Sequence, residues 1–156
     1  MLWDTHMHSQ FSGDSHTPQE DMIAAARQKN LKGICFTDHL DIDYPDEPET
    51  FLLDLPNYVS SVEAMQEKYK EILPVRLGIE LGLQPHLACI HADILSQYPF
   101  DFVIGSSHVM HALILIIRLI GKTTRRRKAI RNILNPFWKI SQFSMVLTSM
   151  VTSTTW

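Results

Sequence analysis

Hydrophobic and polar positions follow two different rhythms along the chain up to about His108. Short apolar runs predict strands, whereas apolar residues spaced three or four positions apart, as in Val59, Val62 and Met65, predict helices. We expect Thr17 to cap the first helix. The predicted strands are Leu2–His8, Lys32–Asp38, Pro74–Leu81 and Asp101–Ser106, and the predicted helices are Pro18–Asn30, Pro56–Ile72 and Gln84–Tyr98. This alternation indicates an α/β fold with a parallel sheet, either an incomplete barrel or a small open sheet.

Each predicted strand ends in a side chain that could bind a metal ion. His6 and His8 close the first strand and share one face of it, because side chains alternate along a strand. His39 follows the second strand, Glu80 lies near the end of the third, and His108 follows the fourth. In parallel α/β folds the carboxyl ends of the strands form the rim where ligands gather. Taken singly, Glu80 could be a solvated strand end, His108 a loop cap, and Asp38 a carboxylate that fixes the tautomer of a neighbouring histidine. Together the strand-end residues predict a polynuclear metal site.

Other polar residues are weaker candidates. Asp14, in the loop after the first strand, is a possible further ligand, with a role in the loop turn as the alternative. We expect His16 to be a surface or capping histidine. His86 and His91 lie on the helix after the third strand, away from the rim, and we expect them to be solvated or partly buried.

Charge divides the chain near His111. All 17 acidic residues and all eight histidines lie at or before this position, with six of the 14 basic residues, so residues 1–111 have a formal charge of −11 and residues 112–156 a charge of +8. Two cysteines, Cys35 and Cys89, are too few for a disulfide framework, and we expect both to be buried thiols of a cytoplasmic protein. The aliphatic run 113–117 is far shorter than the ~20 residues that cross a bilayer.

Four segments resemble, in order and spacing, the motifs of the polymerase-and-histidinol-phosphatase (PHP) family. They are Asp4-Thr5-His6-Met7-His8-Ser9, Phe36-Thr37-Asp38-His39-Leu40-Asp41, Gly78-Ile79-Glu80-Leu81-Gly82 and Ile104-Gly105-Ser106-Ser107-His108-Val109-Met110-His111. The residues of these motifs are most similar to those of the monofunctional histidinol-phosphatases. The resemblance covers residues 1–111 and implies the N-terminal part, about four βα units, of a distorted (β/α)7 barrel that is TIM-like.

The resemblance also implies roles for individual residues. His6 and His8 would bind a first metal ion, Glu80 would bridge two ions, and His108 would bind the second. Asp14 and His39 would bind a third, so that two or three divalent ions (zinc, manganese or iron) are expected. We expect Asp4 and Asp38 to support these ligands from behind. The family also needs a histidine from a Gly-His-Leu-Asp strand and a C-terminal Asp-x-His, and this chain contains neither.

The implied chemistry is hydrolysis of a phosphomonoester, with no catalytic group separate from the metal ligands. Metal ions bind the phosphate oxygens, lower the pKa of a bridging water so that hydroxide forms near neutral pH, and stabilise the leaving alkoxide. The implied substrate is L-histidinol phosphate, in histidine biosynthesis. The alternatives are another phosphoesterase of the family, such as a nuclease or a protein-tyrosine phosphatase, or an inactive fragment with residual metal binding.

The composition of residues 112–156, which include basic but no acidic residues, does not match that of residues 1–111. If the last base of each codon is joined to the first two bases of the next, the displaced frame permits His-Gly-His-Leu-Asp-Tyr-Val over residues 149–156. It also permits an acidic amphipathic run over residues 125–139. We therefore expect a frameshifted tail that arose by a single-base deletion after His111. On this view the basic run 125–128 is an accident of the reading frame. We expect neither a nucleic-acid partner nor a membrane partner.

Overall fold

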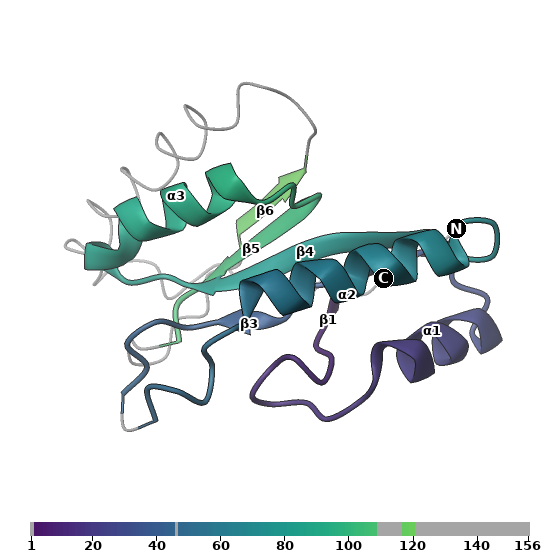
Figure 1. Cartoon of the computed structure of the whole chain (residues 1–156), viewed down its shortest axis with the longest axis horizontal. Coiled ribbons are helices and arrows are strands. Elements are labelled where there is room, and N and C mark those ends of the chain that lie inside the picture. The colour runs from purple at the N-terminus through teal and green to yellow at the C-terminus, as the bar shows by residue number, and fades with distance from the viewer. Residues whose placement is uncertain (1, 46, 109–116, 121–156) are drawn as a thin grey trace, which may run out of the picture. The chain divides into compact units, whose positions relative to one another are not determined.

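A computed structural model of the chain describes residues 2–45, 47–108 and 117–120. The parallel strands are β1 (Asp4–Met7), β2 (Ile34–Phe36), β3 (His39–Leu40), β4 (Val75–Gly82) and β5 (Phe102–Ser106), and β6 is Ile117–Ile120. The helices are α1 (Gln19–Gln28), α2 (Leu55–Tyr69) and α3 (Ala88–Gln97), with a 3₁₀ turn η1 (Pro85–Leu87) directly before α3. Helices connect the parallel strands, except that β3 follows β2 directly. The α/β class with a curled, half-barrel sheet is confirmed (Figure 1).

The sheet has the order β1-β2-β4-β5-β6, with β3 also paired to β4. Strand β4 is the centre, because β2 pairs with its first residues, β3 with its last residues and β5 with its other edge. Strand β6 pairs antiparallel with β5. The remainder of the predicted tail, with its basic run, lies outside the described residues, as does His111.

The core lies between β4 and α2. Alternate residues of β4 are buried aliphatic side chains, among them Leu77 and Ile79, and α2 contributes Tyr58 and Val62, both fully buried. Burying such a side chain stabilises a fold by roughly 1.5–3 kcal/mol. The Tyr58 hydroxyl donates a hydrogen bond of 2.8 Å to the Gly78 carbonyl and so joins the helix to the strand. The opposite alternate positions of β4 are Gly78, Glu80 and Gly82. Glu80 and Gly82 face the polar side chains described below, whereas Gly78 lies against Cys35 and Thr37.

Helix ends follow local chemistry. Asp54 caps α2 by accepting a hydrogen bond from the Asn57 amide, and Pro56 occupies the first turn of this helix. After α1, Asn30 adopts a φ of 55°, a left-handed conformation that suits the residue following a helix. The predicted cap at Thr17 is wrong, because α1 begins after Pro18 and has no side-chain cap.

Two further expectations need correction. Strand β2 is shorter than the predicted strand 32–38, and the chain forms a separate strand β3 after it. At the break, the Thr37 hydroxyl accepts a hydrogen bond from the Met7 amide, and the Asp38 carboxylate accepts one from the Ser9 amide. Cys35 is buried as expected, but Cys89 is exposed on α3. Within the described residues no helix is both long and apolar enough to cross a membrane.

Candidate metal centre

Four histidines and two carboxylates meet at the carboxyl ends of the parallel strands. His6 belongs to β1 and His8 follows it, while His39 opens β3 directly opposite Glu80 of β4. His108 follows β5, the strand on the other side of β4. The parallel register therefore brings residues far apart in the sequence to one edge of the sheet, as the strand-end pattern predicts.

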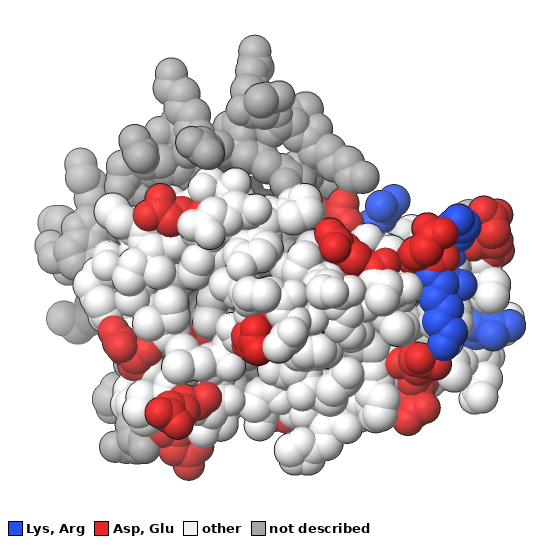
Figure 2. Space-filling view, in the orientation of Figure 1, with Lys and Arg blue, Asp and Glu red and all other residues white. Residues whose placement is uncertain are grey.

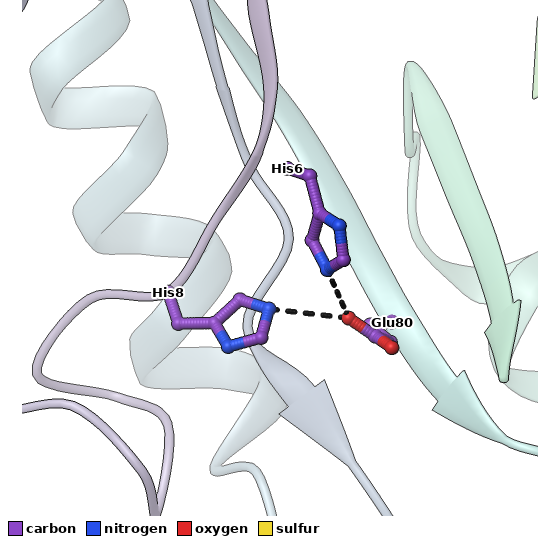
Figure 3. Close-up of side chains that lie close together, drawn as sticks. All are labelled: His6, His8 and Glu80. Carbon is purple, nitrogen blue, oxygen red and sulfur yellow. Dashed lines mark hydrogen bonds and ion pairs between the residues drawn. The ribbon is translucent and has the colours of Figure 1, made fainter. Parts of the chain in front are cut away.

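Glu80 is the centre of this group, and its side chain is only 3 % exposed. Its Oε2 atom lies 2.6 Å from His6 Nε2 and 3.1 Å from His8 Nε2 (Figure 3). The other oxygen, Oε1, accepts a hydrogen bond from the Ser106 hydroxyl and lies 3.3 Å from His108 Nε2. Three imidazoles from two separate strands thus point their Nε2 atoms at one carboxylate.

Asp14, in the loop after β1, is a second carboxylate that contacts two histidines of the site. Its Oδ2 atom lies 2.9 Å from His8 Nδ1 and 3.5 Å from His39 Nε2. Its Oδ1 atom accepts a hydrogen bond of 2.6 Å from the Ser12 hydroxyl, which fixes the orientation of the carboxylate. His8 consequently lies between two carboxylates, with one ring nitrogen toward Asp14 and the other toward Glu80.

Asp41 is a buried carboxylate of the site that the sequence interpretation missed. Its Oδ1 atom accepts a hydrogen bond of 2.6 Å from His108 Nδ1, and its Oδ2 atom lies 3.2 Å from His39 Nδ1. The signal that could have revealed it is the Asp38-His39-Leu40-Asp41 sequence, because residues two apart on an extended chain share a face. Ser12 and Ser106, which orient Asp14 and Glu80, were missed as well.

These contacts shift the pKa values of the groups involved. Burial lowers the pKa of His8, but hydrogen bonds to Glu80 and Asp14 outweigh it and raise the value to about 9. The hydrogen bond to Asp41, supported by Glu80, raises the pKa of His108 to about 9. Burial acts against ionisation of Glu80, yet the hydrogen bonds from His108, His6, His8 and Ser106 hold its pKa far below the usual range. The metal-free site therefore holds protonated imidazoles against ionised carboxylates.

Asp38 and Asp4, the two carboxylates expected to support the ligands, differ in burial and in their hydrogen-bond partners. Asp38 is buried and accepts hydrogen bonds of 2.6 and 3.0 Å from the Ser9 amide and hydroxyl, so it fastens the loop that carries His8. Burial raises the pKa of Asp38. Asp4 is exposed and accepts a hydrogen bond of 3.3 Å from the amide of His6.

The three remaining histidines of the described chain lie outside this group. His16 is exposed, and His86 is exposed and pairs with Asp43 at 3.0 Å. His91 is 1 % exposed, so the expectation that it is solvated or partly buried is wrong. It follows Leu87 by four residues and precedes Leu95 by four, and this spacing puts it on the buried face of the helical segment.

The donor set suits a divalent metal ion. Ligand atoms within 4.8 Å of one another form three overlapping groups, which are His6, His8 and Glu80; His8, Asp14 and His39; and His39, Glu80 and His108. Each pair of groups shares one residue. Imidazole nitrogens with carboxylate oxygens are the ligands of zinc and of the neighbouring transition metals. All six residues predicted as ligands are thus brought together, and their assignment as ligands stays a prediction.

Basic side chains lie at the other end of the strands. Lys32 lies two residues before β2, and Arg76 is near the start of β4. Arg27, Lys68 and Lys70 lie at the ends of α1 and α2. Figure 2 shows Lys and Arg gathered at one end of the visible face, among acidic groups, and only acidic groups over the remainder. No lysine or arginine side chain that the structure describes has a contact with the six predicted ligands.

Comparison with known proteins connects this geometry to a family. The model of the PHP domain matches residues 4–135, which extends past His111. The chain is 35% identical over 128 residues to a probable histidinol-phosphatase of Clostridium acetobutylicum, covering 82% of this chain and 48% of that protein. It is 33% identical over 105 residues to a histidinol-phosphatase of Lactococcus lactis, covering 67% and 38%. The chain spans less than half the length of the curated relatives it matches.

Solved structures agree on the fold. A crystal structure of histidinol phosphate phosphatase from Lactococcus lactis, complexed with zinc, L-histidinol and phosphate, matches with a TM-score of 0.65 and 32% identity, covering 69% of this chain and 40% of that one. A putative histidinol phosphatase from Listeria monocytogenes matches with a TM-score of 0.63 over 84% of this chain and 52% of that one; at 18% identity it supports the fold alone. With four motifs, a half-barrel sheet and a matching family model, the chain belongs to the PHP domain family.

Proposed function

We propose that this chain carries the N-terminal part of a metal-dependent phosphomonoester hydrolase whose substrate is L-histidinol phosphate. The observation that carries the proposal is the arrangement around Glu80, where His6, His8 and His108 direct ring nitrogens at the two oxygens of one buried carboxylate. A carboxylate with both oxygens engaged in this way suits a bridge between two ions.

The proposed ligands are His6, His8, Asp14, His39, Glu80 and His108, for two or three divalent ions of zinc, manganese or iron. Such ions would polarise the phosphate and lower the pKa of a bound water. The chain's own residues supply the rigid frame: Ser106 holds one oxygen of Glu80, and Ser12 holds one oxygen of Asp14. Ser9 and Asp38 fasten the loop that carries His8.

Two findings support the choice of substrate. The matching crystal structure from Lactococcus lactis contains zinc, L-histidinol and phosphate. The Clostridium and Lactococcus relatives are named for histidinol-phosphatase activity, at 35% and 33% identity. The six proposed ligands all lie inside the region that matches the family model, residues 4–135.

Zinc binding by the purified chain tests the metal site. We expect weak zinc binding in a competition titration with a chromogenic chelator, and at least a tenfold further loss of affinity in His8→Ala, because His8 belongs to two of the three ligand groups. His16→Ala is the matched control, since His16 is an exposed histidine of the same loop region outside these groups. Equal zinc affinity in the wild type and His8→Ala would refute the proposed site.

Phosphate release tests the substrate. With zinc or manganese present, release from L-histidinol phosphate should exceed release from a phosphorylated oligonucleotide or a phosphotyrosine peptide. We expect turnover to be slow and metal binding weak, because the chain contains neither Gly-His-Leu-Asp nor a C-terminal Asp-x-His. Preferential release from the oligonucleotide would instead make the chain a nuclease of the same family.

A further inference from the structure

Asp41 contacts two of the proposed metal ligands at once, through the Nδ1 atom of each imidazole. Its Oδ1 atom accepts a hydrogen bond of 2.6 Å from His108 Nδ1. Its Oδ2 atom lies 3.2 Å from His39 Nδ1, an ion-pair contact without the alignment of a full hydrogen bond. The Nε2 atoms of the same rings point the other way, that of His108 toward Glu80 at 3.3 Å and that of His39 toward Asp14 at 3.5 Å.

The position of Asp41 is fixed by its surroundings. The residue is 1 % exposed and follows β3, and its amide donates a hydrogen bond of 2.9 Å to the Phe51 carbonyl. The Phe51 ring in turn packs edgewise on His39, with 5.4 Å between the ring centroids.

Room for this carboxylate exists only because position 82 of β4 is a glycine. A Cβ atom built on Gly82 would lie 1.8 Å from Asp41 Oδ1, the oxygen that holds His108. Any other residue at position 82 would therefore displace the carboxylate.

We infer that Asp41 is a positioning residue that keeps the proton of His39 and His108 on Nδ1 and leaves Nε2 of both rings free to bind metal. This inference rests on the proposed function for the identity of the metal site. A ring nitrogen that binds a metal ion must carry no proton, and a carboxylate on the opposite nitrogen selects that tautomer and fixes the ring plane. One side chain thereby sets two ligands that come from β3 and from the end of β5.

Asp41→Asn tests this role with little change in shape. An amide offers one acceptor oxygen and one donor nitrogen, so only one of the two rings can keep its Nδ1 proton against it. The other ring must move its proton to Nε2, the atom that is needed for the metal ion. We expect a 10- to 100-fold loss of zinc affinity, the range typical of such supporting groups. In long-range ¹H–¹⁵N spectra of the zinc-loaded protein, one of the two imidazoles should lose its Nδ1–H pattern.

Asp43→Asn is the matched control. Asp43 also contacts a histidine, His86 at 3.0 Å, but this pair is exposed and includes none of the proposed ligands. Its φ of 57° also suits asparagine. The control should bind zinc as the wild type does. Equal zinc affinity in Asp41→Asn and Asp43→Asn, with both imidazole patterns unchanged, would overturn the role of Asp41.

Gly82→Ala supplies a second and independent perturbation. The added methyl group should push Asp41 Oδ1 away and weaken zinc binding through His108, with Asp41 itself unchanged. Gly105→Ala on the neighbouring strand β5 is its control, because a Cβ atom there meets only the flexible Leu83 side chain, at 3.0 Å. Equal zinc affinity in the two alanine variants would count against the inference.

Failure of the proposed function is a separate result. If the wild type binds no zinc, the metal site is wrong. The tautomers of His39 and His108 in the metal-free protein at alkaline pH, where both rings are neutral, then still decide whether Asp41 selects Nδ1–H. A mixture of tautomers in the wild type there would overturn the inference about Asp41.

Discussion

His91 should make the stability of this fold sensitive to mild acid. It lies on α3 with 1 % of its surface exposed, and its Nε2 atom has no hydrogen-bond partner within the described part of the chain. Burial lowers its pKa from 6.5 to about 4, an effect that the charge of Asp41 opposes and that of His86 reinforces. The folded protein thus keeps this imidazole neutral at a pH where an exposed histidine is protonated.

The direction and size of this pH effect on stability follow from the pKa values of His91 in the unfolded and the folded chain. Between pH 6.5 and about pH 4 the unfolded chain binds a proton at position 91 that the folded chain does not bind. The contribution of His91 is therefore fully present above pH 6.5 and is lost as the pH falls toward 4. One pKa unit corresponds to about 1.4 kcal/mol, so the whole loss in the free energy of unfolding is about 3 kcal/mol.

The raised pKa values of His8 and His108 act in a different window. Their contribution is fully present below pH 6.5 and is lost as the pH rises through about 9, so it does not change between pH 6.5 and 4. The ionised carboxylates of the site also lose their contribution to the free energy of unfolding in acid, but this loss is the same in the wild type and in a variant at position 91. Comparison with such a variant therefore isolates His91.

Urea unfolding of the wild type and His91→Leu, at pH 7 and at about pH 4, measures this effect. The wild type should lose about 3 kcal/mol more than His91→Leu between the two conditions. His16→Gln serves as the control, because His16 is exposed and its replacement should leave the pH dependence unchanged. If the wild type and His91→Leu lose the same stability, His91 is not held neutral by burial and this reasoning fails.

Two further predictions concern the ligands and the tail. Zinc should displace protons from His8 and His108, whose pKa values of about 9 keep them charged at neutral pH, so its affinity should rise from pH 7 toward 9. Calorimetry in two buffers of different ionisation enthalpy measures this release, and buffer-independent heats would contradict it. We also propose that the gene, read in the displaced frame after the His111 codon, encodes Gly-His-Leu-Asp. Sequencing decides this, and a displaced frame without that motif would leave residues 112–156 as the authentic continuation.

The strand-end pattern predicted the meeting of five of the six proposed ligands, all except Asp14 of the loop after β1, because parallel register depends on features visible in the sequence. Each strand is a short apolar run, each is followed by a polar group, and helices of sufficient length return the chain to the same edge. His6, His8, Glu80 and His108 are brought together for this reason. The division between β2 and β3 was not predicted; at this division the Thr37 and Asp38 side chains accept hydrogen bonds from the amides of Met7 and Ser9, which are distant in the sequence.

The residues that the sequence did not reveal are those whose roles depend on contacts across the fold. Asp41 resembles an ordinary loop carboxylate until β5 brings His108 against it. His91 and Cys89 belong to one apolar stretch, yet only His91 lies on the buried face. A helical count from Leu87 would have separated the two, because it places His91 four residues on and Cys89 only two.

Charge explains why ions must precede phosphate at the proposed site. Glu80 and Asp41 are buried and ionised there, Asp14 is ionised at the rim, and these carboxylates already pair with the protonated imidazoles of His8 and His108. The described lysines and arginines have no contact with these ligands. Among the described residues, a phosphate dianion entering the metal-free site would therefore meet no lysine or arginine and would lie close to carboxylates. Divalent ions that displace the imidazole protons reverse this balance, so on the proposed function metal binding creates the phosphate site rather than merely activating it.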